Sequence, residues 1–156
     1  MDVSREIGGS RLSFVTGDIL ESTAQCIVNP VNTVGVMGSG LALKFKKRYP
    51  SMFDAYKIQC KNGSLNTGRL MFYKMSDADR IICLFPTKQH WQNPSTLEYI
   101  DRGLDAFIQH YAEWDITSVA FPKLGCGLGG LNWDYHVGPL LTRKLSDLPI
   151  DVQIYI

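Results

Sequence analysis

The fold class can be inferred from residues 26–49, which read CIVNPVNTVGVMGSGLALKFKKRY. The first three, Cys26–Val28, form an apolar run that is typical of a strand buried on both faces, and Asn29-Pro30 ends it. A glycine-rich loop, Gly35–Gly40, then leads into a helical pattern over Leu41–Tyr49. A buried strand joined to a helix in this way is typical of α/β proteins with a largely parallel sheet.

The rest of the chain continues this mixture of strands and helices. Apolar runs and alternating patterns predict further strands over residues 11–16, 69–74, 80–85, 118–121 and 152–155. Helical periodicity predicts further helices over residues 51–61, 97–111 and about 133–145. A capping box, Ser95 with Glu98, is expected to open the second of these helices. The sequence therefore predicts a three-layer α/β/α domain with a mixed sheet of about six strands.

The composition is that of one ordinary globular domain. The 156 residues are 45% hydrophobic and 20% charged, so we expect a single domain over 1–156, with residues 1–10 as a loose extension. The net charge of +1 excludes a protein that binds polyanions through its overall field. The four cysteines form no C-x-x-C pair, so neither a metal nor a disulfide is expected. No segment resembles a signal peptide or a membrane span, and we expect a cytoplasmic monomer without a membrane partner.

Several polar or flexible residues follow predicted strands. Ligands of open α/β sheets bind outside the carboxyl ends of the strands. Asp18, Asn29, Lys88 and the loop from Gly125 all come directly after a predicted strand. We therefore expect these residues to converge on one cleft.

Two glycine-rich loops, Gly35–Gly40 and Gly125–Gly130, each precede a predicted helix. Glycine lets backbone N–H groups approach a phosphate, and a helix N-terminus favours an anion, so a pyrophosphate between the loops is one hypothesis. Two tight turns without a ligand remain the alternative. A nicotinamide-binding domain is rejected, because the second loop is followed by one helix and one strand only. The first loop also lacks the Lys-Ser/Thr of a phosphate-binding ATPase loop.

These segments together resemble a known family. Gly17-Asp18-Ile19, residues 27–32, the Gly35–Gly40 loop and residues 122–130 are similar to the macro domain, an ADP-ribose-binding module, and the resemblance runs from Leu12 to the C-terminus. Two longer stretches, 32–50 and 85–91, and the sequence Leu131-Asn-Trp133 resemble the DarG branch, antitoxins that remove ADP-ribose from DNA.

The resemblance implies a role for each matching residue. Asp18 would bind the adenine amine beside the backbone of Ile19, and Tyr155 would pack on the adenine. Asn32 would contact the distal ribose near the bond to be broken and would take part in catalysis with Lys88. The remaining ADP-ribose contacts would come from Gly38, Ser39 and Gly40 of the first loop and from Gly125, Cys126, Gly127, Leu128 and Gly129 of the second. No cofactor or metal is implied.

Lys88 matches the catalytic lysine of the DarG branch. As a neutral amine it would attack the anomeric carbon; as an ammonium it would stabilise or protonate the departing base, and the second role is favoured for thymine. Related terminal ADP-ribose glycohydrolases pair their lysine with an aspartate in the second loop, where this chain has Gly129. The resemblance thus implies release of ADP-ribose from thymidine in single-stranded DNA, against a DNA ADP-ribosyltransferase toxin. Release from protein Glu or Asp, or binding of ADP-ribose without cleavage, are the alternatives.

Contacts with nucleic acid would have to come from local groups, given the small net charge. Lys46 and Lys47 belong to a basic run in the first predicted helix, and such a run either is a solvated face or meets a DNA backbone. Trp91 either offers a stacking face for an unpaired base or packs against the protein. His90 is expected to contact the nucleic acid or order this loop, with a proton relay as the alternative.

Overall fold

The computed structural model describes residues 11–76 and 78–156. The loose extension expected over residues 1–10 lies outside the described residues. None of the described helices is both long enough and apolar enough to cross a membrane.

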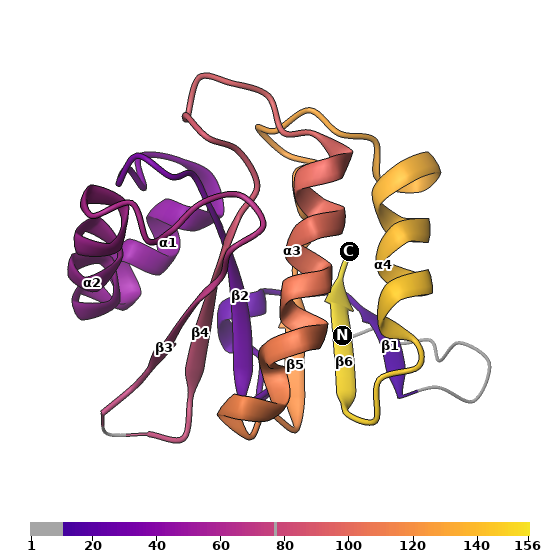
Figure 1. The fold of residues 1–156 in the computed structure, drawn as a ribbon. Helices are drawn as coiled ribbons and strands as arrows, with labels where there is room; N and C mark the ends of the chain where they lie inside the picture. The colour runs from indigo at the N-terminus through magenta and orange to yellow at the C-terminus, as the bar shows by residue number, and fades with distance from the viewer. Residues whose placement is uncertain (1–10, 77) are drawn as a thin grey trace.

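The core of the molecule is one six-stranded sheet with the strand order β1-β6-β5-β2-β4-β3 (Figure 1). Neighbouring strands are parallel except β3 and β4, which pair antiparallel. The strands are β1 (Leu12–Val15), β2 (Cys26–Val31), β3 (Met71–Lys74), β4 (Ile81–Pro86), β5 (Ser118–Phe121) and β6 (Asp151–Tyr155). The predicted mixed sheet is therefore confirmed.

Helices cover both faces of the sheet. On one face lie α3 (Leu97–His110) and α4 (Gly138–Leu145), which are side by side in Figure 1. The other face is covered by α1 (Gly40–Arg48) and α2 (Pro50–Lys61). Shorter turns are η1 (Ile19–Glu21), η2 (Tyr111–Trp114) and η3 (Trp133–Val137). The three-layer α/β/α arrangement is confirmed.

Strand β2 shows why both faces are covered. Its residues alternate between two hydrophobic clusters: Cys26 and Val28 pack with α3 and α4, whereas Ile27 and Val31 pack with α1 and α2. A strand buried on both faces has to be apolar at consecutive positions, which is the run seen in the sequence.

Strand β2 does not end at Asn29-Pro30 as expected but continues to Val31. It pairs with β5 only over Cys26 and Ile27, whereas it pairs with β4 along its whole length. Pro30 therefore lies where β2 has one neighbouring strand, a place where a missing N–H is tolerated. Asn29 is fully buried within the sheet and directs its Nδ2 at the sulfur atoms of Met37 and Met52, so the expectation that it faces the cleft is wrong.

Two helix starts also differ from the expectation. The N-cap of α3 is Thr96, whose hydroxyl accepts from the N–H of Tyr99, and Ser95 is buried instead. The last predicted helix is divided into a π-helical turn, η3, and α4. Asn132 caps η3 by accepting from the N–H of Tyr135. The wider turn directly follows the second glycine loop and contributes Trp133 to the cavity described below.

Candidate active site

The loops that follow β2, β4 and β5 lie together at the carboxyl ends of these strands (Figure 1). Residues of these loops line a cavity of about 630 Å³. Its walls come from three loops: the first glycine loop, the second glycine loop, and the loop of residues 87–96 between β4 and α3, called here the Lys88 loop. From the predicted set, the lining includes Asn32, Gly38, Ser39, Gly40, Lys88, Trp91, Gly125, Cys126, Gly127, Leu128 and Gly129. Segments separated by up to about 100 residues in the sequence thus share one site, as the topology of a parallel sheet requires.

Asn32 follows β2 and holds the first glycine loop in place. Its Nδ2 donates to the carbonyl of Val36 at 2.8 Å, and its Oδ1 accepts from the N–H of Val34 at 3.1 Å. The hydroxyl of Tyr56, on α2, lies 2.7 Å from the same Oδ1 and 2.9 Å from the Asn32 carbonyl oxygen. The Asn32 carboxamide is therefore held by Tyr56 and by the backbone of the first glycine loop. One of its two Nδ2 hydrogens is left for a ligand in the cavity.

Tyr56 is fully buried and is available as a hydrogen-bond donor across the whole neutral range. Burial of its ring raises the pKa of the hydroxyl well above the ordinary tyrosine value, so the hydroxyl keeps its proton. Because a buried hydroxyl without a partner is costly, the bond to Asn32 also stabilises the fold.

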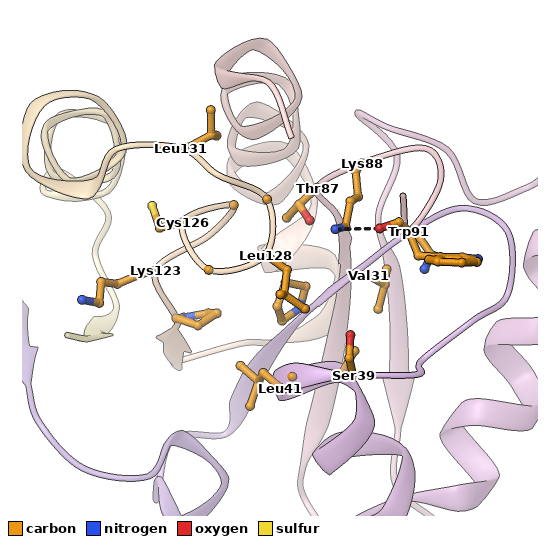
Figure 2. Close-up of a pocket in the computed structure, with 18 of the residues that line it drawn as sticks. Val31, Ser39, Leu41, Thr87, Lys88, Trp91, Lys123, Cys126, Leu128 and Leu131 are labelled. Atoms are coloured by element: carbon orange, nitrogen blue, oxygen red, sulfur yellow. Dashed lines mark hydrogen bonds between the residues drawn. The ribbon is translucent and has the colours of Figure 1, made fainter. Parts of the chain in front are cut away.

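Lys88 is half-buried and comes two residues after β4. Its Nζ donates to the carbonyl of Trp91 at 3.3 Å, which closes the Lys88 loop on itself. In Figure 2 the side chains of Lys88 and Ser39 approach the cavity from opposite sides. Thr33 fastens the same loop to the first glycine loop, because its N–H and its hydroxyl both donate to the carbonyl of Gln89.

The second glycine loop packs too tightly for a side chain at Gly129. A Cβ there would lie 2.6 Å from the carbonyl oxygen of Gly125 and closer still to the hydroxyl of Ser95. The N–H of Ser95 donates to the Gly129 carbonyl at 3.0 Å, so the loop and the residues before α3 are joined at this point. An aspartate at position 129 would displace the backbone at Gly125. The presence of glycine at this position agrees with that lack of space.

The charge of the cavity wall is entirely positive. Lys88 and Lys123 are the charged residues among those that line the described cavity, and no carboxylate lines it. Burial raises the pKa of the Cys126 thiol to about 11, so this lining residue is neutral at physiological pH. Exposed backbone N–H groups of glycine loops together with two ammonium groups favour an anionic ligand.

The residues predicted for the adenine lie at another part of the same sheet edge. Val15 of β1 is in register with Tyr155 of β6, and both parallel strands end there. Asp18 follows β1 and caps η1, its carboxylate accepting from the N–H of Leu20 at 3.0 Å. Ile19 is buried and Tyr155 is half-buried, and none of these three residues lines the 630 Å³ cavity.

The residues predicted to contact nucleic acid fall into two groups. The rings of His90 and Trp91 pack beside each other, with centroids 5.0 Å apart and planes tilted by 30°. Trp91 is half exposed and lines the cavity, whereas His90 does not. Lys46 lies on α1 with its Nζ 4.4 Å from the centroid of the Phe53 ring, and Lys47 is exposed on the same helix.

Further lining residues did not stand out in the sequence. Val36, Leu41 and Thr87 line the cavity as apolar or neutral side chains, and nothing in their local pattern distinguishes them from core residues. Leu131 and Trp133, which were noted only for their resemblance to the DarG branch, line it as well. Lys123 is different, since a charged residue that comes two residues after a buried strand is the same signal that points to Lys88. Its side chain is directed away from Lys88 in Figure 2.

Comparison with known proteins agrees with this geometry. The family model "Macro domain" matches residues 28–137, which include the first glycine loop, the Lys88 loop and the second glycine loop. A DNA ADP-ribosyl glycohydrolase of Mycobacterium tuberculosis is 44% identical over 147 residues, a match that covers 92% of this chain and 42% of the relative. The chain thus spans about two fifths of the length of four curated relatives that match it at 40% identity or more.

Two solved structures are similar over nearly the whole chain. The macrodomain of Mycobacterium tuberculosis DarG superposes with a TM-score of 0.90 at 44% identity, covering 94% of this chain and 98% of that one. Thermosipho africanus DarTG in complex with ADP-ribose superposes with a TM-score of 0.92 at 39% identity, covering 98% of this chain and 43% of that one. With its fold, its two glycine loops and the matched family model, the chain belongs to the macro domain family.

Proposed function

We propose that this chain is an ADP-ribosyl glycohydrolase that binds ADP-ribose and removes it from modified thymidine in single-stranded DNA. The observation that carries the proposal is a cavity at the carboxyl ends of the central strands that contains Lys88 and no carboxylate. The similarity to DNA ADP-ribosyl glycohydrolases over 92% of the chain supports the same activity. A solved relative, Thermosipho africanus DarTG, binds ADP-ribose, which supports this ligand.

The ligand is proposed to run along the sheet edge from β1 to β4. Its diphosphate lies between Gly38–Gly40 and Gly125–Gly129, and its distal ribose meets Asn32. Its adenine lies at Asp18, Ile19 and Tyr155. Strands β1 and β2 are three positions apart in the sheet order, so they are separated by roughly 14 Å at about 4.8 Å per strand. Only an elongated ligand occupies both places at once.

The proposed reaction breaks the bond between the anomeric carbon and a thymine nitrogen. The electron pair of this bond leaves with the thymine, and Lys88 as an ammonium stabilises the charge and donates a proton to the nitrogen. Water then adds to the anomeric carbon and returns a proton to the Lys88 amine. The net change is the addition of one water, and no metal, oxidant or cofactor takes part.

The DNA itself is proposed to contact groups outside the cavity. Trp91, a half-exposed lining residue that packs beside His90, offers a face for an unpaired base. Lys46 and Lys47 on α1 provide cations for the backbone. The natural counterpart is proposed to be a DNA ADP-ribosyltransferase toxin of the cytoplasm, since a Thermosipho africanus relative is a fusion of such a transferase with a glycohydrolase.

The decisive test compares substrates and one substitution. The wild type and Lys88→Ala are incubated with an ADP-ribosylated thymidine oligonucleotide and with a glutamate-ADP-ribosylated protein, and released ADP-ribose is quantified. We expect release from DNA by the wild type, at least about a hundredfold slower release by Lys88→Ala, and little release from protein. ADP-ribose affinity, measured by calorimetry, serves as the control that Lys88→Ala keeps its fold.

Each alternative has its own outcome. Release from the protein substrate alone would favour a protein deribosylase. Binding of ADP-ribose without release from either substrate would favour a reader module. Undiminished release by Lys88→Ala would reject the role of the lysine while leaving the substrate assignment in place.

A further inference from the structure

Helices α1 and α2 carry a strong local excess of positive charge. Together they contain six basic residues, Lys44, Lys46, Lys47, Arg48, Lys57 and Lys61, and one acidic residue, Asp54. The two helices therefore carry a net charge of +5, and the rest of the chain carries −4, because the whole chain carries +1. The small net charge conceals this separation.

The five lysines of α1 and α2 have no acidic side chain of the described structure as an ion-pair partner. Arg48 pairs with Glu21 at 3.1 Å, but none of the five lysines forms an ion pair with a described residue. Lys46 and Lys57 lie on the same Phe53 ring, with Nζ atoms 4.4 Å and 5.1 Å from its centroid. The two ammonium groups repel each other because they lie near the same ring, and an anion bound beside them would offset this repulsion.

A second, shallow hollow of about 360 Å³ lies between the first glycine loop and two of these lysines, Lys57 and Lys61. Its lining consists of Val34, Gly35, Lys57, Cys60 and Lys61. Gly35 has φ +86°, and a Cβ at this position would already be in contact with Cys60 and Lys57, so the loop backbone lies directly on α2.

The hollow and the main cavity share one loop. Val34 and Gly35 line the hollow, whereas Asn32 and Val36 of the same loop line the main cavity. An extended ligand that leaves the cavity across this loop therefore arrives at Lys57 and Lys61. The exposed Val34 side chain lines the hollow together with these cations, and Ile58, the neighbour of Lys57 on α2, is also exposed.

We propose that Lys46, Lys57 and Lys61, the α1–α2 lysine surface, bind the backbone phosphates of the DNA strand that flanks the modified nucleotide. This proposal rests on the proposed function, since it requires DNA at the cavity. Unpaired ammonium groups bind phosphates through counterion release, which is independent of base sequence and weakens with salt. The exposed Val34 and Ile58 side chains suit unstacked bases.

The test uses charge reversal at two matched sites. Lys57→Glu and Lys57→Glu/Lys61→Glu alter the lysine surface, and Arg143→Glu makes the same single charge change on exposed α4, across the sheet. Binding of an unmodified, fluorescent single-stranded oligonucleotide is measured by anisotropy over a range of NaCl concentrations. The affinity for ADP-ribose alone is measured for each variant.

We expect Lys57→Glu to weaken oligonucleotide binding about fivefold to tenfold at 50 mM salt and to lower the salt slope by about 0.7 per lost phosphate contact. The affinity for ADP-ribose should stay within about twofold of the wild type, because neither lysine lines the main cavity. Arg143→Glu should behave as the wild type in both assays.

Equal effects of Lys57→Glu and Arg143→Glu on the oligonucleotide would overturn the proposal, as would an unchanged oligonucleotide affinity in the double variant. The latter result is expected if an acidic protein is the real occupant. Failure of the proposed function would show separately, as absent release of ADP-ribose from both modified oligonucleotide and modified thymidine by the wild type.

Discussion

Tyr56 lies behind the cavity wall and does not line the cavity itself. Its hydroxyl nevertheless determines how Asn32 is oriented, and Asn32 in turn holds the backbone of the first glycine loop. Gly129 is a second residue of this kind, since its lack of a side chain lets the other loop pack on Ser95. The site thus depends on residues that fix the backbone as well as on Lys88.

Tyr56→Phe is expected to reduce kcat about tenfold while lowering the free energy of unfolding by only about 1 kcal/mol. The ring remains buried, but Asn32 loses the hydrogen bond that fixes its carboxamide. Steady-state kinetics on modified oligonucleotide and urea unfolding check the two effects. The matched control is Tyr73→Phe on β3, which should change neither. Equal kcat values for the two variants would contradict a positioning role for Tyr56.

Helix α3 illustrates how an element is placed by packing rather than by its own sequence. Its apolar face, with Ile100, Leu104 and Phe107, was readable from helical spacing. Its closeness to β4 depends on Gly103, because a Cβ there would overlap the Phe85 ring, with three ring atoms at 2.9 Å or less. Phe85 lies on β4, three residues before Lys88, so this contact also helps to position the Lys88 loop.

Gly103→Ala is expected to destabilise the protein by about 2 kcal/mol, although alanine is intrinsically better in a helix by about 1 kcal/mol. The added methyl group forces the Phe85 ring or the whole helix to move. Urea unfolding measures the loss. In the double variant Gly103→Ala/Phe85→Leu the smaller side chain should accept the methyl group, so the combined loss should be less than the sum of the two single losses. Simple additivity would show that the helix is not held by this contact.

The sheet as a whole buries two cysteines at its centre, Cys26 on β2 and Cys83 on β4. Burial raises the pKa of both thiols above the ordinary value, because a thiolate would lose its hydration there. The unfolded chain therefore releases these protons at a lower pH than the folded chain. Above that pH the unfolded state binds fewer protons, so stability falls as the pH rises.

We expect the free energy of unfolding to be insensitive to these thiols below about pH 8.5 and to fall above it, by up to about 1.4 kcal/mol per pH unit for each thiol. Urea unfolding at pH 7.5, 8.5 and 9.5 measures this slope. A Cys26→Ala/Cys83→Ala variant should start from a lower stability but lose less of it across the same range. Parallel slopes for the two proteins would show that the buried thiols do not control alkaline stability.

Most of the architecture was predictable because it follows from local patterns. The apolar runs at Cys26–Val28 and Ile81–Phe85 require a sheet covered on both faces, and the helical spacing after Thr96 requires a helix with one apolar side. The placement of Lys88 and both glycine loops at one edge followed from the rule that ligands lie at the carboxyl ends of parallel strands. Asn29 escaped this reasoning, because a polar residue at the end of an apolar run is indistinguishable in sequence from one still inside the strand.

The remaining features depend on contacts between residues distant in the sequence. Tyr56 and Asn32 are 24 residues apart, and only the packing of α2 against the sheet brings the hydroxyl to the carboxamide. Lys46 and Lys57 approach the same Phe53 ring because α1 packs against α2. This packing extends the basic run of α1 into a positively charged surface shared by both helices. Local sequence patterns thus determine the helices and strands and the edge of the sheet at which the candidate site lies. The orientation of its side chains and the clustering of the lysines arise only from packing between these elements.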